Sequence, residues 1–313
     1  MSAPSYRGRF APSPTGDLHL GSAATALVAW LRVRRAGGTL ALRVEDIDIP
    51  RVVAGSEARQ LEDLRWLGLD WDEGPDLGGP HAPYRQSERT DRYEAALAAL
   101  AARDLVYYCD CSRAEIARVA SAPHPGDEGP RYPGTCRPHG TRRRDWKRPP
   151  AIRLAVPPRR IVVDDAFQGS MVQNVAAAVG DFVLKRGDGI YAYQLAVVVD
   201  DLAMGVTEVV RGADLLASAP RQALLAELLG GHAPRFAHVP LLLDETGARL
   251  EKRLASTTVR GLRMSGVSAD EVLTRVARSL GLVDPHRTVS LSALRDLFDP
   301  TPLHNRPHAH LRT

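Results

Sequence analysis

The segment from Arg9 to Ser22 combines features that would bind a phosphate group. A loop rich in Pro and Gly, residues 12–16, leads into His19-Leu20-Gly21-Ser22 at the start of a predicted helix. A helix N-terminus presents free N–H groups and a partial positive charge to an anion, and Gly21 would let a nucleotide approach the backbone. His19 would then hydrogen-bond a phosphate. On its own the pattern is a weak signal, because a His followed by Gly at a helix start is more often an ordinary cap or a packing accident.

A second basic segment, Arg249-Leu250-Glu251-Lys252-Arg253, lies about 230 residues later on a loop that follows a predicted strand and turn. Such a density of positive charge would offset charge that builds on phosphates during group transfer. Lys252 is one of only three lysines in a chain with 38 arginines. We therefore expect its compact ammonium to have a specific role. The alternative is a solvated charged loop.

Three cysteines, Cys109, Cys111 and Cys136, fall within one short stretch. An odd number argues against a disulfide framework and is consistent with a reducing compartment. Three thiolates are one ligand short of the tetrahedral set of structural zinc. Tyr132, His124 and His139 could supply the fourth ligand, and general ligand statistics favour imidazole over phenolate. The alternative is that the cysteines are free thiols.

Composition sets the broad class. The chain has 313 residues, of which 44% are hydrophobic and 25% charged, and this argues against disorder and coiled coil. It has no apolar run of about 18 residues and no signal peptide, so we expect a cytoplasmic protein that does not enter a membrane. The net charge of +4 permits a polyanionic partner. The basic run Arg142–Arg148 is either a solvated linker or an RNA contact.

Hydrophobic patterns then predict the elements that position these residues. A strand at 6–11, a helix at 21–35 and a strand at 39–45 form a βαβ unit with parallel pairing. Between 109 and 150 the composition indicates an insertion that a metal would hold. The remaining predicted helices span 56–66, 88–103, 214–229, 269–280 and 290–298, and the remaining predicted strands span 151–156, 161–163, 182–184, 190–199, 207–211 and 238–243. We expect the tail from Pro300 to be frayed.

These motifs resemble those of class I aminoacyl-tRNA synthetases, with HLGS and RLEKR in place of the HIGH and KMSKS signatures. RFAPSPTGDLHLG, LRVEDID and YAYQLAVVVDDLAMGVTEVVRGADLL are similar to the glutamyl branch, and the resemblance covers residues 5–260. It implies an α/β fold with a Rossmann-type parallel sheet, helices on both faces, a zinc-bearing insertion and a short helical C-terminal region. Arg249 and Glu251 depart from the second signature, and Glu251 puts a negative charge beside the triphosphate site.

The resemblance also implies a site. The resemblance implies that glutamate contacts Arg9, Phe10, Ala11, Pro12, Ser13, Glu45, Tyr193 and Arg211. Glu45 would pair with the α-ammonium group, and either Arg9 or Arg211 would hold the side-chain carboxylate. ATP would be bound with Mg²⁺ by His19, Gly21, Arg249 and Lys252, of which His19, Gly21 and Lys252 would act in catalysis. The implied division is a catalytic region at 1–108 and 151–260, the insertion at 109–150 and a C-terminal region at 261–313.

The glutamyl-queuosine tRNA(Asp) synthetases are the branch that the chain resembles most. They share a Cys-x-Cys and Tyr-x-x-x-Cys arrangement, which implies one structural Zn²⁺ bound by Cys109, Cys111, Tyr132 and Cys136. Only 60 residues follow Arg253, too few for an anticodon-binding domain of usual size. We therefore expect a monomer that activates L-glutamate with ATP without tRNA and transfers it to queuosine in tRNA(Asp). The alternatives are a minimal glutamyl-tRNA synthetase that charges tRNA(Glu), and an inactive zinc-containing RNA-binding protein.

Overall fold

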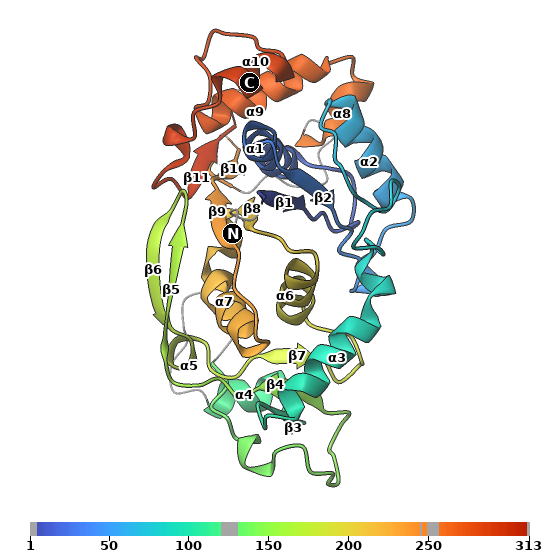
Figure 1. Ribbon diagram of the computed structural model, residues 1–313, viewed down its shortest axis with the longest axis vertical. Helices are drawn as coiled ribbons and strands as arrows, with labels where there is room; N and C mark the ends of the chain where they lie inside the picture. The colour runs from blue at the N-terminus through green and yellow to red at the C-terminus, as the bar shows by residue number, and fades with distance from the viewer. Residues whose placement is uncertain (1–4, 120–130, 245, 249–256, 312–313) are drawn as a thin grey trace.

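The computed structural model describes residues 5–119, 131–244, 246–248 and 257–311 (Figure 1). Within them no helix is long and apolar enough to cross a membrane. The helices are α1 (Leu20–Arg35), α2 (Ser56–Trp66), α3 (Thr90–Ala101), α4 (Arg113–Val119), α5 (Val175–Ala178), α6 (Tyr193–Ala203), α7 (Ala219–Leu228), α8 (Val259–Met264), α9 (Ala269–Leu280) and α10 (Leu291–Leu297). Short 3₁₀ helices are η1 (Ile49–Arg51), η2 (Gln86–Glu88), η3 (Arg137–His139), η4 (Ala213–Ser218) and η6 (Thr301–Leu303).

A six-stranded mixed sheet forms the centre of the molecule. Its strands run in the order β2 (Thr39–Leu42), β1 (Arg7–Phe10), β8 (Glu208–Gly212), β9 (Arg235–Val239), β5 (Arg160–Asp165) and β6 (Gly169–Asn174). Strands β1 and β2 are parallel around α1, which confirms the predicted βαβ unit. The next two neighbours, β8 and β9, are also parallel. The hairpin β5–β6 adds an antiparallel edge, and sequence patterns did not predict β6.

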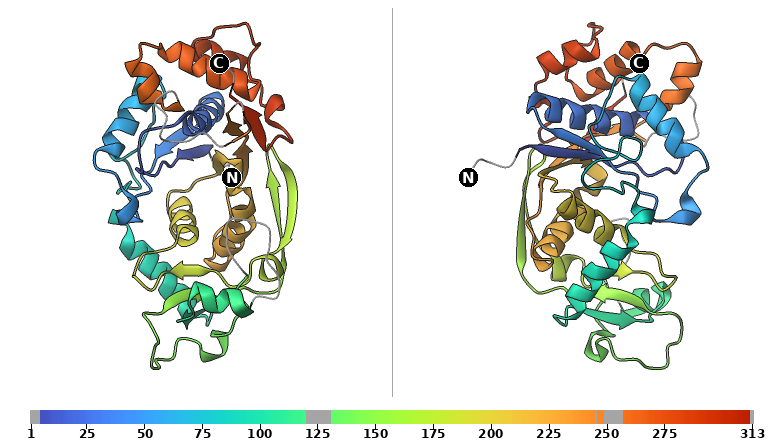
Figure 2. Two further views of the ribbon diagram at one scale, coloured as in Figure 1. Left: turned by 180° about the vertical axis from the view of Figure 1, so that it is seen from behind. Right: turned by 45° about the vertical axis from the view of Figure 1, so that its right-hand side comes forward.

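Helices cover both faces of this sheet. Successive side chains of a strand point to opposite faces, so Val209 and Val210 of β8 enter two different cores. Val210 packs in the core that contains α1, α9 and α10. Val209 packs in the core that contains α3, α6 and α7. Figure 1 and the turned views of Figure 2 show these two helical layers above and below the central strands.

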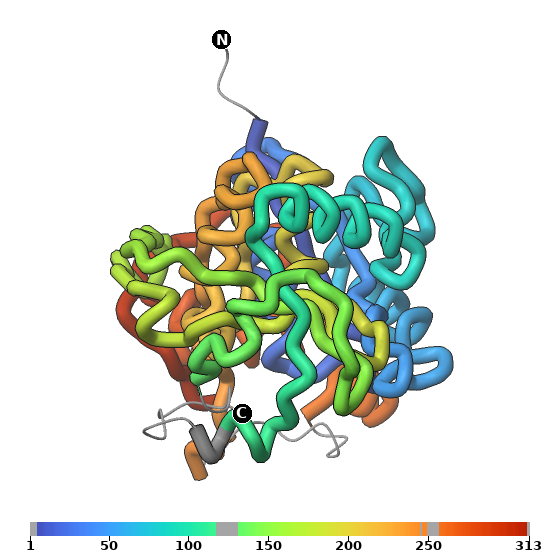
Figure 3. The backbone as a smooth tube through the Cα atoms, turned by 90° about the horizontal axis from the view of Figure 1, so that it is seen from below, coloured from blue at the N-terminus to red at the C-terminus, as the bar shows by residue number. Residues whose placement is uncertain are grey.

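A second, smaller sheet lies at the end of the molecule opposite α9 and α10 (Figure 1). Its strands are β3 (Val106–Cys109), β4 (Ala151–Leu154) and β7 (Val183–Lys185), and both pairings are antiparallel. Together with α4 and η3 they frame the cysteine-containing insertion. Seen from below, this part of the chain faces the viewer (Figure 3).

Helix α6 corrects one prediction. Residues 190–199 were expected to form a strand, but Tyr193–Ala203 is a helix. An apolar run without clear periodicity is compatible with either a buried strand or a buried helix. Here the run packs as a helix between α3 and α7. Two smaller corrections follow the same region: 214–229 divides into η4 and α7, and 238–243 divides into the end of β9 and β10 (Leu241–Leu243).

The C-terminal tail corrects a second prediction. It was expected to be frayed from Pro300, but it is ordered up to residue 311. Strand β11 (His308–His310) pairs in parallel with β10, and Ala309 is buried. Leu303 of η6 is also fully buried, in the core that contains α1. The apolar side chains of the tail therefore anchor it, although Pro and His residues dominate its sequence.

Candidate active site and metal centre

The loop after β1 is held by hydrogen bonds from two neighbouring segments. Glu45 donates its backbone N–H to the Pro12 carbonyl at 2.9 Å, and the Gln60 amide of α2 donates to the Gly16 carbonyl at 2.7 Å. Ala11 and Pro12 are half-buried and Ser13 is exposed. The Phe10 ring instead packs in the core. Of the first-loop residues expected to contact glutamate, Phe10 could therefore contribute only through its backbone.

His19 caps the N-terminus of α1. Its Nδ1 accepts the Ser22 N–H at 3.1 Å, and its Nε2 lies 2.9 Å from the Ser22 hydroxyl. A Cβ atom at Gly21 would lie 3.0–3.1 Å from the imidazole ring, closer than most real contacts. Glycine at this position therefore leaves room for the ring as well as for a ligand near the helix N-terminus.

The residues that follow the basic segment 249–253 lie directly beside the HLGS segment at the start of α1. Thr258 forms a β-bridge with His19, and Val259 donates its N–H to the Leu18 carbonyl at 2.8 Å. Thr258 also caps α8. The chain thus returns to the N-terminus of α1 immediately after the basic segment, whose Arg249 and Lys252 lie outside the described residues.

Asp63 is a buried carboxyl group where α2 packs against α8. It is fully buried, and neither carboxylate oxygen has a hydrogen-bond partner in the described structure. The nearest charge is Arg263 of α8, whose Nη1 is 4.0 Å away and pairs more closely with Glu62. Burial raises the pKa of Asp63 to about 6, with Arg260 acting against the shift.

We expect Asp63→Asn to stabilise the protein at neutral pH. A carboxyl whose folded pKa is about 6 and whose ordinary value is 3.8 makes the folded state lose stability as pH rises through that window. Above pH 6 the penalty is complete and corresponds to at most about 3 kcal/mol. Urea unfolding at pH 7 should show the gain, and at about pH 3.5 the variant and wild type should agree. Glu62→Gln, on the same helix but exposed, should show no gain.

A buried ion network joins the first two strands to α6. The Asp201 carboxylate accepts from Arg9 Nε at 3.3 Å and from Arg43 Nη1 at 2.7 Å. Arg43, fully buried, also donates to Glu45 Oε1 at 3.0 Å. Burial raises the pKa of Glu45, while Arg43 and Arg9 oppose the rise. One carboxylate of α6 therefore fixes Arg9 directly and Glu45 through Arg43.

Tyr193 and Arg211 belong to an adjoining buried network. Tyr193 is the first residue of α6, not part of a strand as expected, and its hydroxyl accepts from Arg211 Nη1 at 3.4 Å. Arg211 also donates from Nη1 to Gln222 at 2.6 Å and from Nε to His238 Nε2 at 2.9 Å. His238 Nδ1 faces Asp165, so the ring carries its proton there, and burial lowers the pKa of His238. Arg211 Nη2 also donates to the Leu215 carbonyl at 3.2 Å, so each of the three nitrogens of the guanidinium is held by the protein.

The two networks are close enough for their charges to act on one residue, Tyr193. Arg211, Glu45, Arg9 and Asp201 all act electrostatically on the Tyr193 hydroxyl, whose pKa is raised by burial and by the two carboxylates. Among the hydrogen bonds of the described residues, Arg9 donates from Nε and Nη1, which leaves Nη2 for a carboxylate ligand. The structure thus brings together Arg9, Glu45, Tyr193 and Arg211, from β1, the end of β2, α6 and β8.

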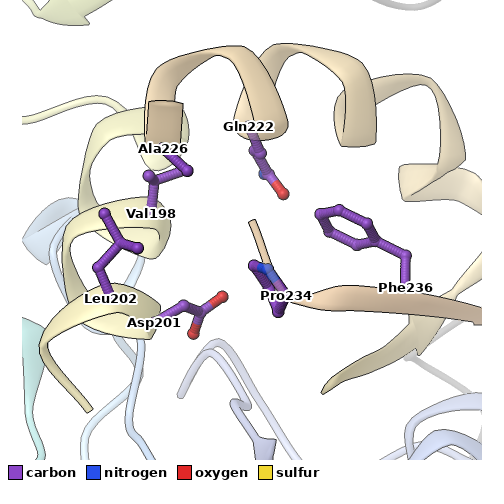
Figure 4. A pocket seen from close by; sticks show the side chains of 7 residues that line it. All are labelled: Val198, Asp201, Leu202, Gln222, Ala226, Pro234 and Phe236. Carbon is purple, nitrogen blue, oxygen red and sulfur yellow. The ribbon is translucent and has the colours of Figure 1, made fainter. Parts of the chain in front are cut away.

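A small pocket adjoins this network between α6, α7 and the start of β9. Figure 4 shows the Asp201 carboxylate and the Gln222 amide pointing into it from opposite walls. Its other lining residues are Val198, Leu202, Ala226, Pro234 and Phe236. It has room for about one water molecule, so it is too small to be the amino-acid pocket.

The three cysteines form one cluster, as their spacing predicted. Cys109 ends β3, Cys136 precedes η3, and the three Sγ atoms lie within 4.8 Å of one another, so this group could hold a metal ion. The Tyr132 hydroxyl is 3.4 Å from Cys109 Sγ and 3.8 Å from Cys111 Sγ. His139 is exposed and is not part of the cluster. His124 lies outside the described residues.

Comparison with known proteins shows the family to which the chain belongs. Residues 5–288 match the family described as tRNA synthetases class I (E and Q), catalytic domain. The chain belongs to this family. The synthetase is 52% identical over 297 residues to a protein of Symbiobacterium thermophilum named glutamyl-Q tRNA(Asp) synthetase, covering 93% of this chain and 92% of the relative. A protein of the same name from Nitratidesulfovibrio vulgaris is 51% identical, covering 88% and 87%.

Solved structures confirm the expected fold class of the synthetase. A crystal structure of a glutamate-tRNA synthetase from Elizabethkingia anophelis is similar with a TM-score of 0.83 and 31% identity. The match covers 99% of this chain and 68% of that chain. The class I α/β fold predicted from the two signatures is therefore confirmed.

Sequence analysis of the synthetase missed the residues behind the site. Arg43, Asp201, Gln222 and His238 orient the predicted glutamate ligands. Arg43 and Asp201 lie within the LRVEDID and YAYQLAVVVDDLAMGVTEVVRGADLL segments but received no role from them, and Gln222 and His238 lie outside both. One signal was present: Asp200 and Asp201 interrupt an otherwise apolar run. Adjacent carboxylates in a segment that must be buried require cationic partners, and this chain supplies arginines.

Proposed function

We propose that this synthetase activates L-glutamate with ATP in the absence of tRNA and transfers it to queuosine in the anticodon loop of tRNA(Asp). The observation that carries the proposal is the 52% identity, over nearly the whole of both chains, to a relative named glutamyl-Q tRNA(Asp) synthetase. The site geometry supports the amino-acid part. It offers two arginines, a carboxylate and a phenol hydroxyl to a substrate with two carboxylates and an ammonium group.

In this proposal each glutamate group has a partner. The ammonium group pairs with Glu45, whose carboxylate is oriented by Arg43. Because Arg9 donates to the protein from Nε and Nη1, we assign its remaining nitrogen, Nη2, to a substrate carboxylate. Arg211 supplies positive charge from a fixed position, and the Tyr193 hydroxyl beside it adds a directional hydrogen bond.

The chemistry has two steps. The glutamate α-carboxylate attacks the α-phosphate of ATP, forming glutamyl-adenylate and releasing pyrophosphate. His19, the N-terminus of α1 and Lys252 stabilise the phosphate charge, and Gly21 allows the nucleotide to approach. Mg²⁺ bound with ATP supplies further charge neutralisation. A queuosine hydroxyl then attacks the acyl carbon, which gives the ester and AMP. Positioning of the reactants adds to this electrostatic stabilisation, and neither step requires a protein general base.

We further propose that the cysteine cluster holds one structural Zn²⁺, with Tyr132 as the fourth ligand. Zinc prefers tetrahedral sets rich in thiolate sulfur, and the Tyr132 hydroxyl faces Cys109 and Cys111. No position in such a set is open to substrate, so the ion would stabilise the insertion and take no part in the reaction.

The test of the proposal is glutamate-dependent ATP–pyrophosphate exchange without tRNA, followed by transfer of labelled glutamate. We expect exchange with glutamate, its collapse in Lys252→Ala, and transfer to queuosine-containing but not unmodified tRNA(Asp). Charging of the 3′ end of tRNA(Glu) would instead identify a minimal glutamyl-tRNA synthetase. Absence of exchange even with tRNA would overturn the enzymatic proposal in favour of an RNA-binding protein.

A further inference from the structure

The proposed zinc site carries an unbalanced charge. Three thiolates and one phenolate around Zn²⁺ leave a formal charge of −2. Cys109, Cys136 and Tyr132 are all buried, each with no more than 4% of its surface exposed. A net charge in such surroundings is costly unless opposite charges lie next to it. The side chains that touch the four ligands therefore bear on how tightly the ion is held.

Arg144 touches one of the sulfur ligands. Its Nη2 lies 3.3 Å from Cys136 Sγ and donates to Asp110 Oδ1 at 2.6 Å. Asp110 in turn accepts the backbone N–H of Lys147 at 3.1 Å. The guanidinium also stacks over the Trp146 ring, 4.7 Å from its centroid. Asp110 Oδ1 also lies 3.8 Å from Cys136 Sγ, so Arg144 is fixed between a carboxylate and the thiolate and its positive charge faces both.

Arg153 of β4 touches the oxygen ligand's ring. Its guanidinium carbon lies 4.0 Å from the centroid of Tyr132, and Nη1 donates to the Asp181 carbonyl at 2.8 Å. The residue is 9% exposed. A cation over an aromatic face is attracted by the ring's negative charge. Arg153 would therefore hold a positive charge directly against the ring of the oxygen ligand.

The side chains of the basic run Arg142–Arg148 have different partners. Lys147 and Arg148 pair with Glu115 of α4, and Arg144 faces the cysteine cluster. Arg142 and Arg143 are exposed. The sequence predicted either a solvated linker or an RNA contact for this run. At least one of its residues, Arg144, instead contacts the cysteine cluster.

We propose that Arg144 and Arg153 form a second layer around the zinc site that offsets the charge of its ligands and so sets its affinity for the ion. The inference rests on the proposed zinc site and concerns residues that are not themselves ligands. Both are positioning residues that act through Cys136 and Tyr132. Arginine is suited to the role because its guanidinium remains charged and can both hydrogen-bond and stack.

The test is competition for zinc between the purified full-length protein and a chromophoric chelator. We expect Arg144→Gln and Arg153→Gln each to weaken zinc binding about 10- to 100-fold, the usual effect of removing a residue that supports a metal ligand. Arg153→Lys should restore part of the loss because it keeps the charge. Arg143→Gln, the exposed neighbour, should bind zinc as wild type does. Unchanged affinity in Arg144→Gln would overturn the proposal.

Two further measurements separate this inference from those on which it rests. Cobalt-substituted protein should show thiolate-to-metal absorption in wild type and in each variant, because the ligands are retained. Wild-type protein that binds neither zinc nor cobalt would overturn both the site and its second layer. Glutamate-dependent exchange, measured on the same preparations, reports separately on the proposed function, because the insertion and α1 lie toward different ends of the molecule (Figure 1).

Discussion

Asp201→Asn is expected to raise the KM for glutamate about a hundredfold and to leave the KM for ATP nearly unchanged, because removing one partner of a buried hydrogen-bonded charge pair costs about 3 kcal/mol. Burial alone would raise the pKa of Asp201, but the positive charges of Arg43 and Arg9 outweigh burial. The pKa therefore lies below its ordinary value, and the group is a carboxylate. Asparagine would leave both guanidiniums without their shared counter-charge. Arg9 and, through Arg43, Glu45 would then lose their fixed orientation.

The measurement is pyrophosphate exchange as a function of glutamate and of ATP. The matched control is Asp200→Asn, since Asp200 is also buried on α6 but binds Arg89 at 2.6 Å and Tyr93 at 2.8 Å. Asp200 lies 3.8 Å from Arg43 Nε without a hydrogen bond to it, and in the described structure it forms no ion pair with Arg9. We expect the control to lose stability while its KM for glutamate stays close to that of wild type. An equal rise of the glutamate KM in both variants would show that loss of packing, not loss of the Arg9 partner, is responsible.

Loss of the metal is expected to expose the insertion to proteases while exchange activity is largely retained. The cysteine cluster lies in a small core of its own, which consists of Tyr107, Cys109, Ile116, Tyr132 and Cys136. So few apolar side chains cannot stabilise a segment of this length. Structural zinc supplies folding free energy directly, about 10–16 kcal/mol in isolated zinc-finger peptides. Removal of the proposed ion would therefore remove the main contribution that holds the insertion.

Limited proteolysis mapped by mass spectrometry would test this expectation with wild type, chelator-treated wild type and Cys136→Ala. New cleavage sites should fall between residues 109 and 150, and chelator should add nothing in the variant. Exchange kinetics on the same samples should stay near wild type, because the predicted site lies on β1, α1 and β8. Cleavage spread evenly over the catalytic region would contradict a local role for the metal.

The parts of the fold that sequence predicted well have strong local signals. The first strand, helix and strand alternate within 36 residues, and Gly37 and Gly38 mark the helix end. Helices α2 and α9 match their predicted bounds because the apolar period is clear. The cysteine cluster was predictable because soft ligands at short spacing point to one use.

The parts that failed depend on contacts distant in sequence. Residues 193–203 contain three consecutive valines, which favour a strand locally, and only packing against α3 and α7 makes the helix. The tail at 308–310 becomes a strand only because β10 offers it a free edge. The ion pairs of Asp201 join residues 158 and 192 positions apart, a relation that a local pattern cannot express.

The position of β1 between β2 and β8 has a consequence for synthesis of the chain on the ribosome. Gly8 pairs with Glu208, and Arg32 of α1 forms an ion pair with the same glutamate. At about 5–20 residues per second, the first strand waits roughly 10–40 s for that partner to emerge. The insertion, by contrast, has its three cysteines and Tyr132 within 28 residues and could take up the proposed ion much earlier. Nascent chains should therefore become ordered around that ion before the six-stranded sheet is complete, because four strands of the sheet follow the insertion in sequence.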